Sequence, residues 1–287
     1  MTALNDFSIL LLLAHFLGDY QLQWDALAKE KAHKVSGLIK HSGIHFALLA
    51  ALFVWGLFQG LGVTLLWPLL ILFAVHVLLD VLKFLLNRAF KNKAKHNARI
   101  ATYVIDQALH LLAILLLSQV FFAGTSKQFE LGSFLTREML NWILLVTLIT
   151  KPANICFKVL FERYQSKPKS DGDSKEDKDQ SDTITRVVVG LDETHQPKAD
   201  TTDPLQDLET LVSVPGAGAI IGNMERMLSA VFLSAGQWAA IGVVFTAKSI
   251  ARFKQIEKDK QFAEYYLIGT LYSILFVVLA YFLVFKI

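Results

Sequence analysis

The chain is poor in cysteine and in charged residues, and both shortages narrow what it can be. Its single cysteine, Cys156, lies inside an apolar segment and cannot form an intramolecular disulfide. Charged residues make up 18% of the 287 residues, and the formal net charge of +3 is too small to indicate nucleic-acid binding. No basic stripe interleaved with aromatic residues occurs either, so we expect no nucleic-acid partner.

Internal repeats and the features of a signal peptide are also missing. We find no self-similarity at a period of about 20 to 50 residues. Asp6 is the only charge before the first apolar segment, so a basic leader is absent, and no small-residue cleavage site follows that segment. We therefore expect the segment to remain in the mature protein.

Long apolar runs are what the chain has in abundance. Hydrophobic residues make up 54% of it, including 21 Phe, and most of the runs approach the roughly 20 residues that cross a hydrocarbon core about 30 Å thick. This pattern predicts an all-α polytopic transmembrane bundle of about seven hydrophobic segments, with six or seven spans. The segments are Phe7–Gln21, Leu38–Phe58, Val63–Leu86, Ile100–Phe122, Met139–Phe161, Met224–Ala247 and Phe262–Phe285.

Lysine and arginine residues predict how the bundle is oriented. They concentrate between the first and second segments and between the third and fourth, so the positive-inside rule makes both loops cytoplasmic. The connections near Gln59 and over 123–136 carry little net charge and are expected outside, together with the N-terminus.

Composition divides the chain into four parts. Residues 1–122 hold the first four segments, and 123–165 hold the fifth. Residues 166–210 are rich in Lys, Asp and Ser, which predicts a disordered cytoplasmic linker. Residues 211–287 are expected to form a C-terminal membrane hairpin.

The sixth segment allows two interpretations. Its uninterrupted length of about 24 residues favours a plain crossing. The alternative is a re-entrant hairpin broken near Gly236, which would return the basic residues after Ala247 to the cytoplasmic side. At the edges of this segment, Glu225 and Arg226 are candidates for a polar cluster that closes the bundle, although snorkelling to the headgroups is the default for such residues.

Each of the first four segments carries two polar residues four positions apart. The stretch "LLLLAHFLGDYQLQW" (10–24) begins as a lipid-facing helix would, yet contains His15 and Asp19. A spacing of four stacks two side chains on one helix face, the geometry with which one helix grips one metal ion. The four pairs are His15 with Asp19, His41 with His45, His76 with Asp80, and Asp106 with His110.

Depth and energy both favour convergence of the four pairs. The topology above, inferred from Lys and Arg alone, places every pair in the cytoplasmic half of the bilayer. Asp costs about 2.5 to 3.5 kcal/mol near the centre of a membrane helix, so Asp19, Asp80 and Asp106 need cations, imidazoles or water beside them.

Three interpretations of the pairs compete. We favour a site for one or two divalent cations (Zn, Mn or Fe), because imidazole and carboxylate suit these metals. The pairs can instead be polar contacts between helices, or a proton or ion pathway. Lys83 is expected to neutralise Asp80 or to snorkel, and Gln107 is a candidate hydrogen-bond partner of the ligands.

Four motifs, "AHFLGDYQLQ", "KHSGIHFALL", "FAVHVLLDVLK" and "VIDQALHLL", resemble a family of bacterial integral membrane proteins known only as domain of unknown function 3307. The resemblance covers about Phe7 to Phe122, and "GAIIGNMERML…AKSIARF" resembles a C-terminal tail of many members. It implies a multi-span helical fold in the bacterial inner membrane and brings no established activity.

The residues themselves predict a membrane metal-dependent hydrolase that acts on a lipid or lipid-linked phosphate at the cytoplasmic face. A metal-bound water would be the nucleophile, and a carboxylate that is not a ligand would be the general base. The alternatives are a metal-ion or proton-coupled transporter, and a membrane scaffold with a structural His/Asp network. The catalytic candidates are Asp19, Asp80 and Asp106, and the metal-ligand candidates are His15, Asp19, His41, His45, His76, Asp80, Asp106 and His110.

Overall fold

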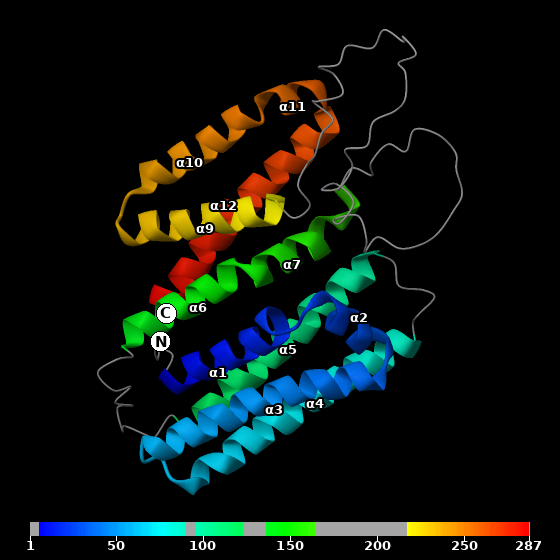
Figure 1. Ribbon diagram of the computed structural model, residues 1–287, viewed down its shortest axis with the longest axis vertical. Helices are drawn as coiled ribbons and strands as arrows, with labels where there is room; N and C mark the ends of the chain where they lie inside the picture. The colour runs from blue at the N-terminus through cyan, green and yellow to red at the C-terminus, as the bar shows by residue number, and fades with distance from the viewer. Residues whose placement is uncertain (1–5, 90–95, 123–135, 165–216, 287) are drawn as a thin grey trace, which may run out of the picture. The chain divides into compact units, whose positions relative to one another are not determined.

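The computed structural model describes residues 6–89, 96–122, 136–164 and 217–286, and within these ranges the fold is all-α, with no strand (Figure 1). The first group of helices comprises α1 (Asp6–Phe16), a π-helical turn (Leu17–Gln21), α2 (Asp25–His33), α3 (Val35–Phe58), a 3-10 turn (Val63–Leu65), α4 (Leu66–Ala89) and α5 (His96–Phe122). The remainder comprises α6 (Arg137–Ile149), α7 (Lys151–Phe161), a 3-10 turn (Glu162–Tyr164), α9 (Ala217–Ser234), α10 (Trp238–Ala251), α11 (Phe253–Lys258) and α12 (Lys260–Lys286).

The structure confirms a helical membrane protein. Among the described residues, five helical segments are long and apolar enough to cross a bilayer, and one of them comprises α6 and α7. They correspond to five of the seven predicted segments, and their bounds are Val35–Phe58, Val63–Ala89, His96–Phe121, Arg137–Phe161 and Lys260–Lys286. Leucine, valine and phenylalanine side chains along these helices are widely exposed on the protein surface, as expected for contact with lipid.

Helix α1 differs from the lipid-facing helix expected from its sequence. Every residue from Phe7 to Phe16 is buried, because α1 packs against α3, α5 and α6, and Figure 1 shows it lying beside α5 and α6. At 11 residues it is also too short to be one of the five spans. Its continuous leucine run therefore forms the centre of the bundle, where a helix that is apolar all round is buried.

The predicted uninterrupted crossing over Met224–Ala247 is wrong. Helix α9 ends at Ser234, Gly236 adopts a left-handed conformation with φ of 69°, and α10 begins at Trp238. Glycine tolerates this conformation without the steric penalty that a Cβ would bring. The helix therefore breaks where the alternative interpretation placed the break.

Glu225 and Arg226 are both buried, so they do not snorkel. Glu225 pairs with Lys248 of α10 at 2.7 Å. The guanidinium of Arg226 donates to the carbonyl oxygen of Ile149 and to the side chain of Asn154. Helix α6 ends at Ile149, and carbonyl groups at a helix end lack intrahelical partners. Arg226 therefore supplies a partner where α6 and α7 meet.

Helix α2 lies between the first and second predicted segments and packs against α3 and α4. Its one buried residue is Leu27. The side chain of Glu30 accepts hydrogen bonds from Lys40 and Ser36 at the start of α3, and these bonds hold the pKa of Glu30 below its usual range. The predicted linker, residues 166–210, lies outside the described residues.

Candidate metal centre

Each of the helices α3, α4 and α5 buries one stripe of side chains that contains both polar and apolar residues. On α5 the stripe is Asp106, His110, Ile114 and Ser118, spaced by four. On α4 it runs from Leu69 and Leu72 to His76 and Asp80, and on α3 from His41 and His45 to Leu49. Side chains three and four positions apart share one helix face, so the stripe that packs the bundle also directs the polar pairs into it.

The π-helical turn after α1 positions Asp19. The backbone N–H of Leu22 donates to the carbonyl of Leu17 at 2.8 Å, a bond five residues long that widens the turn. Such single turns are rare and are frequent at functional sites. Gly18, within this turn, lies against the imidazole of His45: a Cβ built on Gly18 would be 2.5 Å from its Cε1 and Nε2 atoms. Only a residue without a side chain allows this approach.

All eight predicted ligand residues come together. Among the described residues, three groups have ligand atoms within 4.8 Å of one another: His15, Asp19, His45 and His76; His41, His76 and Asp80; and Asp80, Asp106 and His110. His76 belongs to the first two groups and Asp80 to the last two, so the groups form one continuous cluster. Their roles as ligands and catalysts stay predictions.

The first group is the most complete candidate for one ion. The Nε2 atom of His45 lies 2.9 Å from Oδ1 of Asp19, and the rings of His45 and His76 stack with centroids 3.8 Å apart. In a tetrahedral zinc site with bonds of about 2.1 Å, the ligand atoms lie roughly 3.4 Å apart. Ligand atoms of this group that are separated by up to 4.8 Å would have to move closer together to bind one ion.

Asp80 joins the other two groups. Its Oδ2 atom lies 3.3 Å from Nε2 of His41 and 3.4 Å from Nε2 of His76. The geometry of these contacts is not that of hydrogen bonds. The three atoms are therefore buried without a hydrogen-bond partner among the described residues. A buried polar atom without a partner costs about 1 to 3 kcal/mol, and a cation between these atoms would remove that cost.

The tautomer of His110 favours metal binding. Its Nδ1 atom lies 2.8 Å from the backbone carbonyl oxygen of Asp106, which can only accept, so Nδ1 carries the proton. Nε2 therefore presents a lone pair, and within the described chain this buried atom has no hydrogen-bond partner. Metal-bound histidines commonly donate their other N–H to a carbonyl in this way.

Two lysines and one glutamine surround the carboxylates. Lys31 of α2 contacts Oδ1 of Asp80 at 2.9 Å. Lys83 contacts Oδ2 of Asp106 at 2.6 Å, so the expectation that it neutralises Asp80 or snorkels is wrong. The predicted role of Gln107 as a partner of the ligands agrees with its contacts, since its amide donates to Oδ2 of Asp19 at 3.0 Å.

Lys31 was not among the site residues predicted from the sequence, where it counted only toward topology. Its spacing from Leu27 could have indicated its role. Lys31 lies four positions after Leu27, which is the one buried residue of α2. The two side chains therefore share the face of α2 that points into the bundle.

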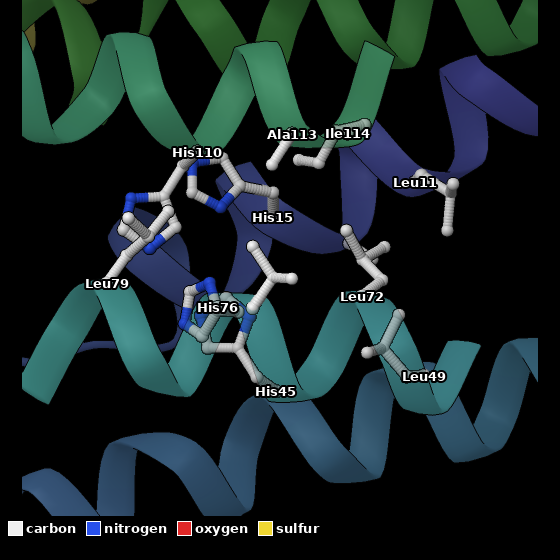
Figure 2. A pocket seen from close by; sticks show the side chains of 12 residues that line it. Leu11, His15, His45, Leu49, Leu72, His76, Leu79, His110, Ala113 and Ile114 are labelled. Carbon is white, nitrogen blue, oxygen red and sulfur yellow. The ribbon is translucent and has the colours of Figure 1, made fainter. Parts of the chain in front are cut away.

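Two cavities of different character adjoin the cluster. One, of about 20 Å³, is lined by His15, His45, His76 and His110 together with apolar side chains. Figure 2 shows the four imidazoles on its left and Leu11, Leu49 and Leu72 on its right. The other, of about 180 Å³, is lined by polar and charged residues that include Asp19, Lys31, Asp80, Lys83 and Gln107. We call this second cavity the polar pocket.

A comparison with protein-family models finds a match over the N-terminal part of the chain. Residues 7–136 match the model of a family described as protein of unknown function. These residues form a DUF3307 domain. The DUF3307 domain contains the four polar pairs and Lys31, as the resemblance of the motifs indicated. The match ends before the C-terminal "GAIIGNMERML", so that part of the resemblance is not covered. No curated protein and no solved structure matches the chain.

Proposed function

We propose that this protein is a membrane-embedded, metal-dependent hydrolase of a lipid or lipid-linked phosphate. The observation that carries the proposal is the continuous His/Asp cluster beside the polar pocket. Five imidazoles and three carboxylates are a donor set suited to Zn, Mn or Fe, and eight ligands are enough for two ions or for one ion with supporting residues.

His15, His45, His76 and Asp19 would hold the first ion, which would supply Lewis-acid activation of a water molecule. In the hydrolysis, the oxygen of water would form a bond to phosphorus while the bond from phosphorus to the alcohol oxygen breaks. The alcohol oxygen would take the electron pair and a proton, so that one water is consumed and an alcohol and a phosphate are released.

A carboxylate would move the proton. Asp19 and Asp80 both line the polar pocket, where water and substrate would enter. With Asp19 bound to the first ion, Asp80 would take the proton of the bound water as general base and return it to the leaving oxygen. Asp106 would hold a second ion together with His110.

The substrate would enter from the cytoplasmic side of a bacterial inner membrane. The polar pocket lies beside α2, within the first basic loop, which the charge rule places in the cytoplasm. The protein would be multi-pass, with its N-terminus outside and residues 166–210 in the cytoplasm. Membrane lipids would be its surroundings and the source of its anionic substrate.

A transporter for a metal ion or protons is the second candidate, favoured by the same buried chain of His and Asp residues. A transport path would have to continue beyond the cluster, where Leu11, Leu49, Leu72 and Ile114 line the small cavity. These side chains offer no ligand to an ion, and this supports hydrolysis over transport. A scaffold with a purely structural network is the third candidate, and it predicts no metal.

The decisive experiment is elemental analysis of the full-length protein purified in detergent after metal-replete growth. We expect about one or two equivalents of a transition metal in the wild type and loss of that metal from the His76→Ala, Asp80→Ala double variant. The matched control, Asp25→Ala with His33→Ala, removes the same two side-chain types from exposed positions on α2 and should keep the metal.

Absence of stoichiometric metal from the wild type would refute the proposal and favour the scaffold. For a metal-loaded protein, two assays in proteoliposomes separate the remaining functions. Release of inorganic phosphate from phosphatidic acid or an isoprenoid phosphate supports the hydrolase. Uptake of the metal ion or of protons without phosphate release supports the transporter.

A further inference from the structure

The polar pocket brings two ammonium groups to the edge of the candidate metal centre. Lys31 and Lys83 come from different helices, α2 and α4, and both line this pocket. Their side chains are 13% and 30% exposed. A lysine that loses much of its contact with water is stabilised by an anionic partner.

The charge of the cluster changes sign when metal binds. With the neutral imidazoles that metal ligation requires, the three carboxylates and the two ammonium groups leave one net negative charge before an ion is counted. One divalent cation makes the net charge positive, and a second cation increases the excess. The ammonium groups that pair with Asp80 and Asp106 are then available to a further anion.

The dimensions of the polar pocket suit a small anionic group. At about 180 Å³ it is smaller than the roughly 300 to 1,000 Å³ of pockets that enclose drug-sized ligands. A phosphate group with a few neighbouring atoms fits such a volume, and a lipid chain would remain outside. Hydrogen-bonding groups of Tyr103, Asn87 and Gln107 also line the pocket.

We propose that Lys31 and Lys83 form an anion subsite that binds the terminal phosphate of a phosphomonoester substrate next to the metal ions. Each ammonium would donate to a phosphate oxygen and keep a contact to its carboxylate. Lysine commonly binds phosphate as a compact point charge. This inference rests on the proposed function, because the positive charge that frees the lysines comes from the metal.

Binding of inorganic phosphate to the metal-loaded, detergent-purified protein, measured by isothermal titration calorimetry, tests the subsite. Lys31→Met and Lys83→Met should each weaken phosphate binding about 10- to 100-fold, as expected for loss of a hydrogen bond between charged groups. Lys31→Arg and Lys83→Arg keep the charge and should retain most of the affinity. The matched control is Lys40→Met, whose lysine is paired with Glu30 and is 57% exposed, and it should bind phosphate as the wild type does.

Metal content measured on the same samples separates the two proposals. A wild type without metal refutes the proposed function and the subsite with it. If the wild type contains metal but binds no phosphate, the subsite alone is refuted. The same holds if both methionine variants bind phosphate as tightly as the metal-loaded wild type. If the methionine variants do not fold, Lys31→Gln and Lys83→Gln replace them, with the same expected loss of phosphate affinity.

The source of the phosphate is determined with vesicles. Reconstituted protein is titrated with inorganic phosphate in phosphatidylcholine vesicles and in vesicles that also contain phosphatidic acid. If the ligand is a lipid phosphomonoester, phosphatidic acid should compete with inorganic phosphate for the wild type. This competition should be lost in Lys31→Met. Binding of inorganic phosphate without such competition assigns the subsite to a soluble phosphate and overturns the lipid assignment.

Discussion

Replacing Gly18 by alanine tests the candidate metal centre with the addition of a single carbon atom. The Cβ built on Gly18 lies 2.5 Å from Cε1 and Nε2 of His45 and 3.0 Å from its Cδ2. Ordinary contacts between such atoms are about 3.5 to 4.0 Å, so the imidazole must move by roughly 1 Å. The backbone of Gly18 is not left-handed, and alanine therefore adds a steric effect alone.

The displacement would act directly on a candidate ligand. His45 Nε2 is 2.9 Å from Oδ1 of Asp19, and its ring stacks on that of His76. Residues that orient metal ligands contribute about 10- to 100-fold to metal affinity, and overpacking of a dense interior costs about 1 to 3 kcal/mol. We expect Gly18→Ala to lower metal affinity within that range and to lower thermal stability.

Gly43→Ala is the matched control. Gly43 lies on α3 between His41 and His45, and no described atom lies within 4 Å of a Cβ built on it. Metal content and competition with a graded series of chelators are measured for both variants. If Gly18→Ala binds metal as tightly as the wild type, His45 is not a metal ligand at this position. A comparable loss in Gly43→Ala would show that any added methyl disturbs this region.

Three further changes have expected outcomes. Arg226→Met should destabilise the protein by about 1 to 3 kcal/mol or more, because it removes the donor to the carbonyl oxygen of Ile149 and to the side chain of Asn154. Chemical denaturation should show little change for the exposed Arg252→Met. Gly236→Ala should lower the free energy of unfolding by about 1 kcal/mol, because Gly236 has a left-handed backbone. Gly242→Ala should not destabilise the protein in the same assay, because no described atom lies within 4 Å of a Cβ built on Gly242. Incubation with a strong chelator should lower the unfolding temperature of the metal-loaded wild type and leave that of His76→Ala, Asp80→Ala unchanged.

Sequence periodicity was sufficient to predict the helices and the convergence of the four polar pairs. The spacing of four directs two side chains to one face whatever the rest of the bundle does. The buried stripe of α5, from Asp106 to Ser118, shows this regularity directly. Five predicted segments also correspond to helices long enough to span, because length and hydrophobicity alone decide that property.

Contacts between helices could not be read from the same patterns. Hydropathy does not distinguish a helix surrounded by lipid from one surrounded by other helices, so α1 was expected to face lipid although all of Phe7–Phe16 is buried. The pairing of Lys83 with Asp106 on α5 rather than with Asp80 depends on how α4 and α5 are rotated, and no local spacing contains that information. The break at Gly236 could be predicted from the local sequence, but the length of the apolar segment favoured an uninterrupted crossing.

The two sides of the His/Asp cluster differ in a way that bears on its function. Toward α2, the carboxylates meet Lys31, Lys83 and a pocket of about 180 Å³. On the other side, four imidazoles border a cavity of about 20 Å³ whose remaining lining is apolar. That volume is close to the minimum that holds one water molecule, so the apolar side can supply a small ligand to a metal but not admit a substrate. The larger pocket on the α2 side is suited to chemistry on a molecule that enters and leaves by the same route, and an ion that crossed the membrane would have to pass leucine side chains of α1, α3 and α4.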